Sequence, residues 1–313
     1  MKSDFVKPQR TRLYPMVQFK KDTWEIDEFD CASIFVLVGT EKALVIDCGI
    51  GIGDLRGAIE SITDKPLIVV LSHGHLEHTG NARQFDEIWM PPADQHVSIP
   101  QDLQVRKDFI TDIANRQKGC LGLPFTMFNL YPFDIDVDVH DPDPDELMPV
   151  IHDLLDGQSF DLGGGRMVTA YSCPGHTPGE MIFLDEQTRT LFAADALNFN
   201  LYLGKVSMET SLPNYKRMQE LSDKYDHIYN GHHDFRAFGA PLDEDCLPTI
   251  IKMMENTLAG HISPCLSGVF GEHSIPLIRQ NQAPSNSNQK TLIRCGRCFM
   301  KFFPDYVHAS QND

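Results

Sequence analysis

The residue types most able to do chemistry are concentrated in one stretch, residues 71–80, which reads LSHGHLEHTG. Neutral imidazole nitrogens and carboxylate oxygens are donors to zinc, iron and manganese. In an extended chain, His73 and His75 are two positions apart and point to the same side. Glu77 and His78 follow where the chain turns toward a helix, so they approach from another side. The spacing favours a metal site over a loop whose histidines bind only backbone atoms, which is the usual role of a single histidine.

Polar residues recur where predicted strands end. The apolar run at residues 66–71 is typical of a strand buried on both faces, and it ends directly before His73. Because strand ends along one edge of a sheet can share a cleft, further candidates are sought at such ends. Three more predicted strands have them, namely residues 167–171, 190–194 and 227–230, which precede His176, Asp195 and the pair His232 and His233.

Composition limits the function. The chain has 313 residues, enough for one large or two smaller domains, and a formal net charge of −17. This acidity disfavours nucleic acid as a partner, although one local basic pocket is compatible with it. The N-terminal sequence predicts no secretory signal, and no apolar run is long enough to span a membrane. Eight cysteines in a chain of this size do not form a disulfide framework, so we expect a cytoplasmic protein.

The first third of the chain predicts a β hairpin at residues 33–39 and 42–47, followed by a glycine-rich loop at residues 48–53. The glycine spacing matches neither a dinucleotide fingerprint nor a P-loop, so a tight strand-to-helix turn is favoured over a phosphate cradle. Asp47, which ends the second strand, is either structural or close to the metal ligands.

The pattern changes in two regions. Residues 92–150 are interpreted as a helical insertion that either lines a substrate pocket or packs as an extra helix pair. Residues 241–313 form a C-terminal extension on or near a domain of residues 1–240. Cys295 and Cys298 have C-x-x-C spacing, and Cys265 and His308 could complete a zinc set. A single such pair is weak evidence, and a strand with two reduced thiols is the preferred interpretation.

Taken together, these motifs resemble the metallo-β-lactamase-fold superfamily. The matching pieces are the strand with Asp47, HGHLEH from His73, PGHTPG around His176, AADAL around Asp195 and NGHH ending at His233. They occur in the order of the superfamily over residues 31–240. The resemblance implies an α/β protein, a four-layer αββα sandwich with a binuclear metal site along one edge.

The resemblance also implies a ligand set of seven residues. His73, His75 and His176 would hold the first metal, Glu77, His78 and His232 the second, with Asp195 bridging both. His232 is preferred to His233 because the ligand of the superfamily directly follows the glycine. The superfamily usually has aspartate where Glu77 stands, and the longer side chain changes how its carboxylate reaches the metal. Two divalent ions are expected, zinc first, with iron or manganese as alternatives.

The predicted function is hydrolysis of an ester-like bond in a small molecule, a thioester, lactone, amide or phosphoester, by a metal-bound hydroxide. Glu77 and Asp195 are the catalytic candidates, with Glu77 as a possible proton acceptor. A di-iron oxidoreductase of the flavodiiron type is one alternative, but such proteins typically have glutamate in the position of His75 and carry a flavin domain. A metal-binding relative without catalysis is another. The sequence leaves the oligomeric state open.

Overall fold

The structure, a computed structural model, describes residues 10–121, 134–142, 147–233, 236–261 and 291–309. It divides into two compact units. Unit 1 comprises residues 1–154, 160–166 and 232–239, and unit 2 comprises residues 155–159, 167–231 and 240–313. The predicted division into residues 1–240 and 241–313 follows the extent of the sequence motifs and stays a prediction. No helix of the described residues is long and apolar enough to cross a membrane.

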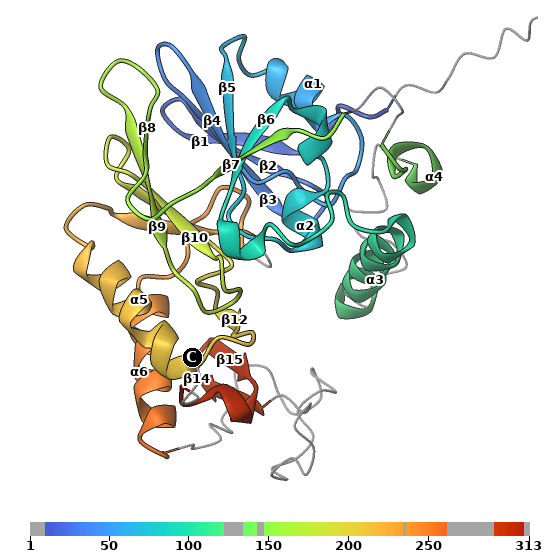
Figure 1. Cartoon of the computed structure of the whole chain (residues 1–313). Coiled ribbons are helices and arrows are strands. Elements are labelled where there is room, and N and C mark those ends of the chain that lie inside the picture. The colour runs from blue at the N-terminus through green and yellow to red at the C-terminus, as the bar shows by residue number, and fades with distance from the viewer. Residues whose placement is uncertain (1–9, 122–133, 143–146, 234–235, 262–290, 310–313) are drawn as a thin grey trace, which may run out of the picture. The chain divides into compact units, whose positions relative to one another are not determined.

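Unit 1 is built on a seven-stranded sheet whose strands lie side by side in chain order (Figure 1). The strands are β1 (Met16–Lys20), β2 (Thr23–Asp27), β3 (Ser33–Val38), β4 (Ala43–Ile46), β5 (Leu67–Val70), β6 (Glu87–Met90) and β7 (Val150–Asp153). The predicted hairpin is confirmed, because β3 and β4 pair antiparallel. The sequence patterns did not predict β7, a short edge strand that begins where the insertion was expected to end.

The direction of the strands explains where the polar residues of unit 1 collect. Strands β4, β5, β6 and β7 pair in parallel, so their carboxyl ends lie along the same edge. Asp47 follows β4, and Ser72 and His73 follow β5 at that edge. Asp94 follows β6, and its side chain accepts a hydrogen bond of 3.0 Å from the backbone N–H of Gly74. The loop with the histidines is therefore held from both neighbouring strands.

The helices of unit 1 are short except for one in the insertion. They are α1 (Leu55–Glu60), α2 (Leu76–Thr79), α3 (Leu103–Leu121) and α4 (Ile135–Asp138), with 3₁₀ turns at Ala82–Gln84 and Pro92–Asp94. Asp54 caps α1 by accepting a hydrogen bond from the backbone of Gly57. The predicted helix of the insertion is confirmed as α3. The apolar stretch predicted at residues 120–133 lies almost wholly outside the described residues.

Unit 2 contains a five-stranded sheet in the order β13-β11-β10-β9-β8 and a three-stranded sheet in the order β12-β15-β14. Because β10 pairs antiparallel with both β9 and β11, and β13 pairs parallel with β11, strands β9, β11 and β13 end at one edge. The strands are β8 (Ser159–Asp161), β9 (Met167–Ser172), β10 (Met181–Asp185), β11 (Thr190–Ala194), β12 (Asn200–Tyr202), β13 (His227–Asn230), β14 (Thr291–Cys295) and β15 (Cys298–Phe302).

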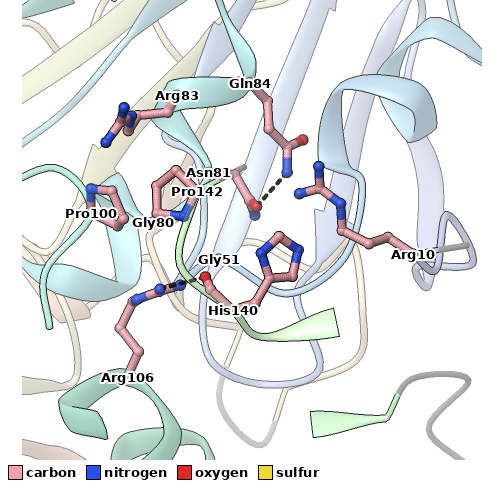
Figure 2. A pocket seen from close by; sticks show the side chains of 10 residues that line it. All are labelled: Arg10, Gly51, Gly80, Asn81, Arg83, Gln84, Pro100, Arg106, His140 and Pro142. Carbon is pink, nitrogen blue, oxygen red and sulfur yellow. Dashed lines mark hydrogen bonds between the residues drawn. The ribbon is translucent and has the colours of Figure 1, made fainter. Parts of the chain in front are cut away.

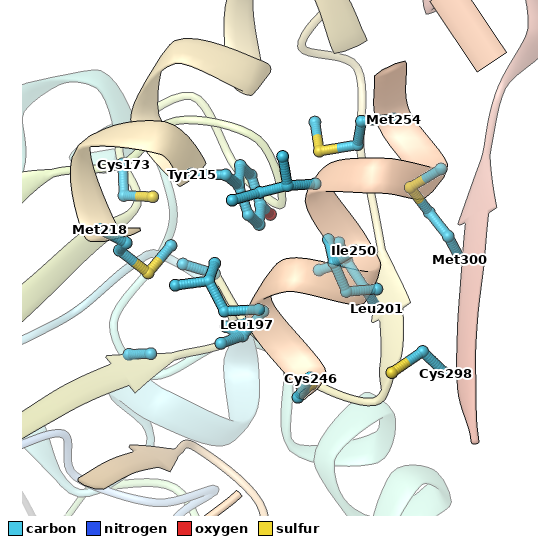
Figure 3. Close-up of a cluster of buried hydrophobic side chains, with 14 of the residues drawn as sticks. Cys173, Leu197, Leu201, Tyr215, Met218, Cys246, Ile250, Met254, Cys298 and Met300 are labelled. Carbon is cyan, nitrogen blue, oxygen red and sulfur yellow. The ribbon is translucent and has the colours of Figure 1, made fainter. Parts of the chain in front are cut away.

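Two helices pack together in unit 2, α5 (Met208–Glu220) and α6 (Cys246–Leu258). Proline normally breaks a helix interior, but Pro213 lies inside α5, and Ser207 caps the N-terminus of this helix. Figure 3 shows side chains of this core converging, among them Leu197, Tyr215 and Ile250.

The C-x-x-C pair forms the tip of the β14–β15 hairpin, where Cys295 and Cys298 face each other across the strands. Both of these cysteines are free thiols. The predicted single strand with two thiols is instead a hairpin, because Cys295 ends β14 and Cys298 begins β15. Of the residues that could complete a zinc set, Cys265 lies outside the described residues, and His308 is exposed and lies 3.7 Å from a carboxylate oxygen of Glu209.

Candidate metal centre

Five of the predicted ligands gather within unit 1, and we call them the ligand cluster: His73, His75, Glu77, His78 and His232. The ring centre of His73 lies 4.8 Å from that of His75 and 4.2 Å from that of His78. The ring of His232 lies 5.4 Å from that of His78, although 154 positions separate them. One ligand atom each from Glu77, His78 and His232 lies within 4.8 Å of the others. These donors converge closely enough to share one ion.

Hydrogen bonds fix which nitrogen His78 can offer. Its Nδ1 lies 2.9 Å from Oδ2 of Asp47, and both side chains are buried. An ionised carboxylate only accepts hydrogen bonds, so Nδ1 carries the proton and donates it. The lone pair of His78 is therefore on Nε2. A histidine oriented through its second nitrogen by a carboxylate is the arrangement that supports metal ligands in proteins.

The same argument extends to His73 through Ser72. The hydroxyl of Ser72 donates to Oδ2 of Asp47 over 2.8 Å, which uses its single proton. Its oxygen lies 2.9 Å from Nδ1 of His73 and must accept there, so Nδ1 of His73 is also protonated. Asp47 thus sets the tautomer of two histidines, one directly and one through a hydroxyl. It does so with φ at +68°, a conformation that few residues other than glycine adopt.

Glu77 lies in the first turn of α2, between the two ends of the histidine motif. Its Oε2 is buried and has no hydrogen-bond partner among the described residues. A buried carboxylate oxygen without a donor is costly, and a cation would compensate for it. The extra methylene of glutamate, relative to the aspartate of the superfamily pattern, therefore does not carry the carboxylate away from the other donors.

Unit 2 supplies the two remaining predicted ligands. Nδ1 of His176 lies 2.7 Å from the backbone oxygen of Tyr202, which can only accept, so Nε2 again carries the lone pair. That Nε2 lies 3.5 Å from Oδ2 of Asp195. Asp195 follows β11, whose last residue, Ala194, has φ at +42°. The backbone N–H of Asp195 donates to the buried carboxylate of Glu180. Strain and hydrogen bonding together hold the carboxylate of Asp195 beside the imidazole.

A second cluster of unit 1 begins at the neighbour of a predicted ligand. We call it the clamp, and it consists of Asp27, Asp30 and His233. Nε2 of His233 lies 3.0 Å from Asp30, and Nδ1 lies 3.7 Å from Asp27. Burial would lower the pKa of His233, but the hydrogen bond to Asp30 and the charges of both aspartates outweigh it and raise that pKa. Burial also raises the pKa of Asp27, to about 7.

The sequence predicted the seven donors but not what orients them. Asp47 was left open between a structural role and a place near the ligands, and its hydrogen bond to His78 places it beside them. Ser72 and the carbonyl of Tyr202 were not considered. Ser72 lies between the strand and the motif, so its position was the one local signal. The role of Tyr202 depends on a backbone atom and leaves no signal in the sequence.

Comparisons with known proteins agree with this arrangement. A family model described as the metallo-beta-lactamase superfamily matches residues 27–232, more than half of the chain. The human acyl-coenzyme A thioesterase MBLAC2 is 24% identical over 229 residues, which cover 67% of this chain and 75% of that protein. The hydroxyacylglutathione hydrolase GloC of Haemophilus influenzae is 26% identical over 166 residues, covering 50% of this chain and 62% of that protein.

Among solved structures, the stereoselective inverting sec-alkylsulfatase Pisa1 from Pseudomonas sp. is similar, with a TM-score of 0.54 and 15% identity. The match covers 79% of this chain and 43% of that chain, so the present protein spans less than half of the sulfatase. At this identity the likeness concerns the fold alone. It agrees with the mixed α/β architecture of several sheets, and the predicted fold class is confirmed.

Proposed function

This chain belongs to the metallo-β-lactamase superfamily and is a metal-dependent hydrolase, and we propose that it cleaves thioesters of small molecules with two zinc ions bound. The names of two relatives support this substrate class, because one describes a coenzyme A thioesterase and the other a hydrolase of acylated glutathione. A lactone is the nearest competitor, since it presents the same kind of carbonyl carbon.

The donors divide into two sets in the proposal. His73, His75 and His176 would hold the first ion, Glu77, His78 and His232 would hold the second, and Asp195 would contribute to both. Two divalent ions held there would lower the pKa of a water molecule toward neutrality and polarise the carbonyl of the substrate.

The observation that carries the proposal is the common tautomer of three histidines. His73, His78 and His176 each direct a protonated Nδ1 at an acceptor of the chain itself. In the neutral imidazole each then has its lone pair on Nε2, the form that metal binding requires. Histidines that served only as hydrogen-bond donors would have no reason to share this pattern.

The protein residues have separate tasks during hydrolysis. Glu77 is both a ligand and the candidate proton acceptor, because its Oε2 is buried and has no donor among the described residues. Asp47 keeps the ring of His78 fixed, which holds the second set of donors in place without reorganisation during the reaction. Asp195 holds its carboxylate beside His176, so it would lie between the two sets.

Metal content is the first test. Protein purified without added metal should contain about two zinc ions per chain by elemental analysis. Glu77→Gln, which removes the charge but keeps the shape, should retain only one. Glu77→Asp, which restores the usual residue of the superfamily, serves as the matched control and should retain more metal than Glu77→Gln. Equal metal content in the wild type and Glu77→Gln would show that Glu77 is not a ligand.

Substrate class needs a second test. The zinc-loaded protein should hydrolyse acyl-coenzyme A and acyl-glutathione with a higher kcat/KM than matched lactones, amides and phosphoesters. His176→Ala should abolish the activity and controls for contaminating hydrolases. Faster cleavage of a lactone would replace the thioester assignment, and no turnover of any member of the panel would favour a metal-binding relative without catalysis.

A further inference from the structure

An arginine-lined pocket of unit 1 lies outside the ligand cluster. It is open to solvent, and it lies beside residues that directly follow the ligand-bearing helix α2 (Figure 2). Three guanidinium groups line it, in a chain whose formal net charge is −17, and no carboxylate is among its described lining residues. The three are Arg10, Arg83 and Arg106.

Arg106 is the most unusual of the three, since it is fully buried. It donates to three backbone oxygens, those of Gln101, His140 and, over 3.5 Å, Ile50. A guanidinium has five N–H groups, so one on each terminal nitrogen has no acceptor among the described residues. It also forms no ion pair with any of them. Burial lowers the pKa of Arg106, although the negative charges of Asp141, Glu28 and Asp102 act to raise it.

Two further features of this pocket provide space and a hydrogen-bond acceptor for a ligand. A Cβ atom at Gly51, where φ is +103°, would come within 2.4 Å of a terminal nitrogen of Arg106, so the absence of a side chain leaves that nitrogen room. Nε2 of His140 is buried without a hydrogen-bond partner among the described residues. Its Nδ1 donates a hydrogen bond to the backbone oxygen of Asp141, so Nε2 can accept a hydrogen bond from a hydroxyl group of a ligand.

We propose that this pocket binds a small tetrahedral oxyanion, specifically a phosphate group. The two remaining N–H groups of Arg106 suit two oxygens of one phosphate, and such charge-assisted pairs are the strong ones. Arg83 and Arg10 add positive charge, and a hydrogen phosphate brings the hydroxyl that Nε2 of His140 accepts. The anion is either free phosphate or a phosphate group carried by the substrate.

Backbone contacts beside this pocket join the loop that follows Asp47 to the loop that follows His78. The backbone N–H of Gly80 donates to the oxygen of Gly49 over 2.6 Å, and a Cβ at Gly80 would lie 2.0 Å from the carbonyl carbon of Ile50. Two loops are thus in direct backbone contact beside the pocket. One follows Asp47 and the other follows His78, so an anion between them braces the pair that orients the second set of donors.

Calorimetric titration with inorganic phosphate tests the site, with chloride at matched ionic strength as the blank. Arg83→Gln and Arg106→Gln should each weaken phosphate binding about tenfold or more. Arg189→Gln is the matched control, because Arg189 is an exposed arginine of unit 2 that pairs with Asp226, and it should leave the affinity unchanged. Arg83, which is only partly buried, keeps the test valid if Arg106→Gln fails to fold.

Phosphate can also bind to metal ions, so His176→Ala separates the two locations. Binding that persists in His176→Ala and weakens in Arg83→Gln supports the pocket. Binding that is lost in His176→Ala but unchanged in Arg83→Gln places the anion on the metals and overturns the proposal. If chloride at the same ionic strength produces the same heat of titration as phosphate, the proposal is also overturned. None of these titrations requires turnover, so their failure leaves the proposed function untouched.

The source of the phosphate follows from kinetics, and this step alone rests on the proposed function. KM is compared in the wild type and Arg83→Gln for an acyl-coenzyme A, which carries phosphates, and for the same acyl group on N-acetylcysteamine, which carries none. A rise in KM confined to the coenzyme A ester identifies the phosphate of the substrate. Unchanged KM for both, together with weakened phosphate binding, identifies free phosphate.

Discussion

The ligand cluster and the clamp begin at neighbouring residues, His232 and His233, yet their imidazoles are used in opposite ways. In the ligand cluster, hydrogen bonds fix Nδ1 of His73 and His78 and leave Nε2 as a lone pair. In the clamp, both ring nitrogens of His233 face carboxylates of the chain itself. The residue type therefore does not decide the role; the partner of the second nitrogen does.

The surroundings explain why both clusters are stable. Two carboxylates beside His233 raise its pKa and favour the charged imidazolium, which completes an internal ion pair. Asp47 also places a carboxylate beside an imidazole, but it meets only one nitrogen and shares its oxygens with Ser72. The clamp thus contains a counter-charge from the chain itself, whereas the ligand cluster holds a buried oxygen of Glu77 with no donor among the described residues.

The largest expected effect separates the two neighbours directly. His232→Gln should lose one metal ion per chain, and its activity should fall by more than the roughly 100-fold that outer partners of a ligand contribute. His233→Gln should keep both ions, because both ring nitrogens of His233 face the carboxylates of the clamp. Elemental analysis and kcat/KM measured on both variants check this. Loss of metal from His233→Gln alone would exchange the two assignments.

The second prediction concerns the residue that sets the tautomers. Asp47→Asn should weaken zinc binding by about 10–100-fold, measured by competition with a chelator, because the amide cannot act as a charged acceptor for His78. Asparagine tolerates a positive φ, so the substitution removes the charge without adding backbone strain. Ser72→Ala, which disturbs only the link to His73, should have a smaller effect. Equal affinity in Asp47→Asn and the wild type would contradict the role of Asp47.

The metal ligands could be predicted from the sequence, whereas the role of Asp47 in orienting them could not. Three histidines and a glutamate within six positions reveal a metal site because ligand type and spacing are local properties. Strands β5, β11 and β13 were likewise predicted, since short apolar runs between turns are local patterns. The contact between Asp47 and His78 joins residues 31 positions apart, and nothing in either segment identifies the other.

The clamp and the arginine pocket were harder still to predict. His233 was considered an outer or surface residue, and its partners Asp27 and Asp30 lie about 200 positions earlier in the chain. The three arginines of the pocket are scattered through the first 106 residues of an acidic protein, where each would pass for surface charge. Only the fold shows that they share a cavity.

The third prediction tests whether the clamp contributes stability. His233→Gln should lower the free energy of unfolding by about 2 kcal/mol, because a charge-assisted hydrogen bond is lost and two carboxylates keep no counter-charge. Urea denaturation measures the change. The double variant Asp30→Asn with His233→Gln should lose less than the sum of the single losses. Strict additivity would indicate that the two side chains do not stabilise each other.

The smallest expected effect concerns Glu28, which lies between Asp27 and Asp30 but points away from the clamp. Its carboxylate accepts hydrogen bonds from the backbone of Ile50, Gly51 and Ile52 and from the side chain of Asn81. One turn of the chain thus supplies both the clamp and an anchor for the loop after Asp47. Burial raises the pKa of Glu28 to about 8, although these hydrogen bonds oppose the shift.

The sign of the resulting pH dependence follows from proton binding. Between the ordinary pKa of 4.5 and about 8, the folded protein keeps a proton on Glu28 that the unfolded chain has released. Stability from this group is therefore complete below pH 4.5 and declines as the pH rises toward 8, by at most about 1.4 kcal/mol for each pH unit. Glu28→Gln, which mimics the protonated acid, should lack this component. From pH 5 to pH 8, the difference in unfolding free energy between the two proteins should shift in favour of Glu28→Gln. A constant difference would mean that the hydrogen bonds keep Glu28 ionised over this whole range. The turn would then act as a fixed anionic anchor.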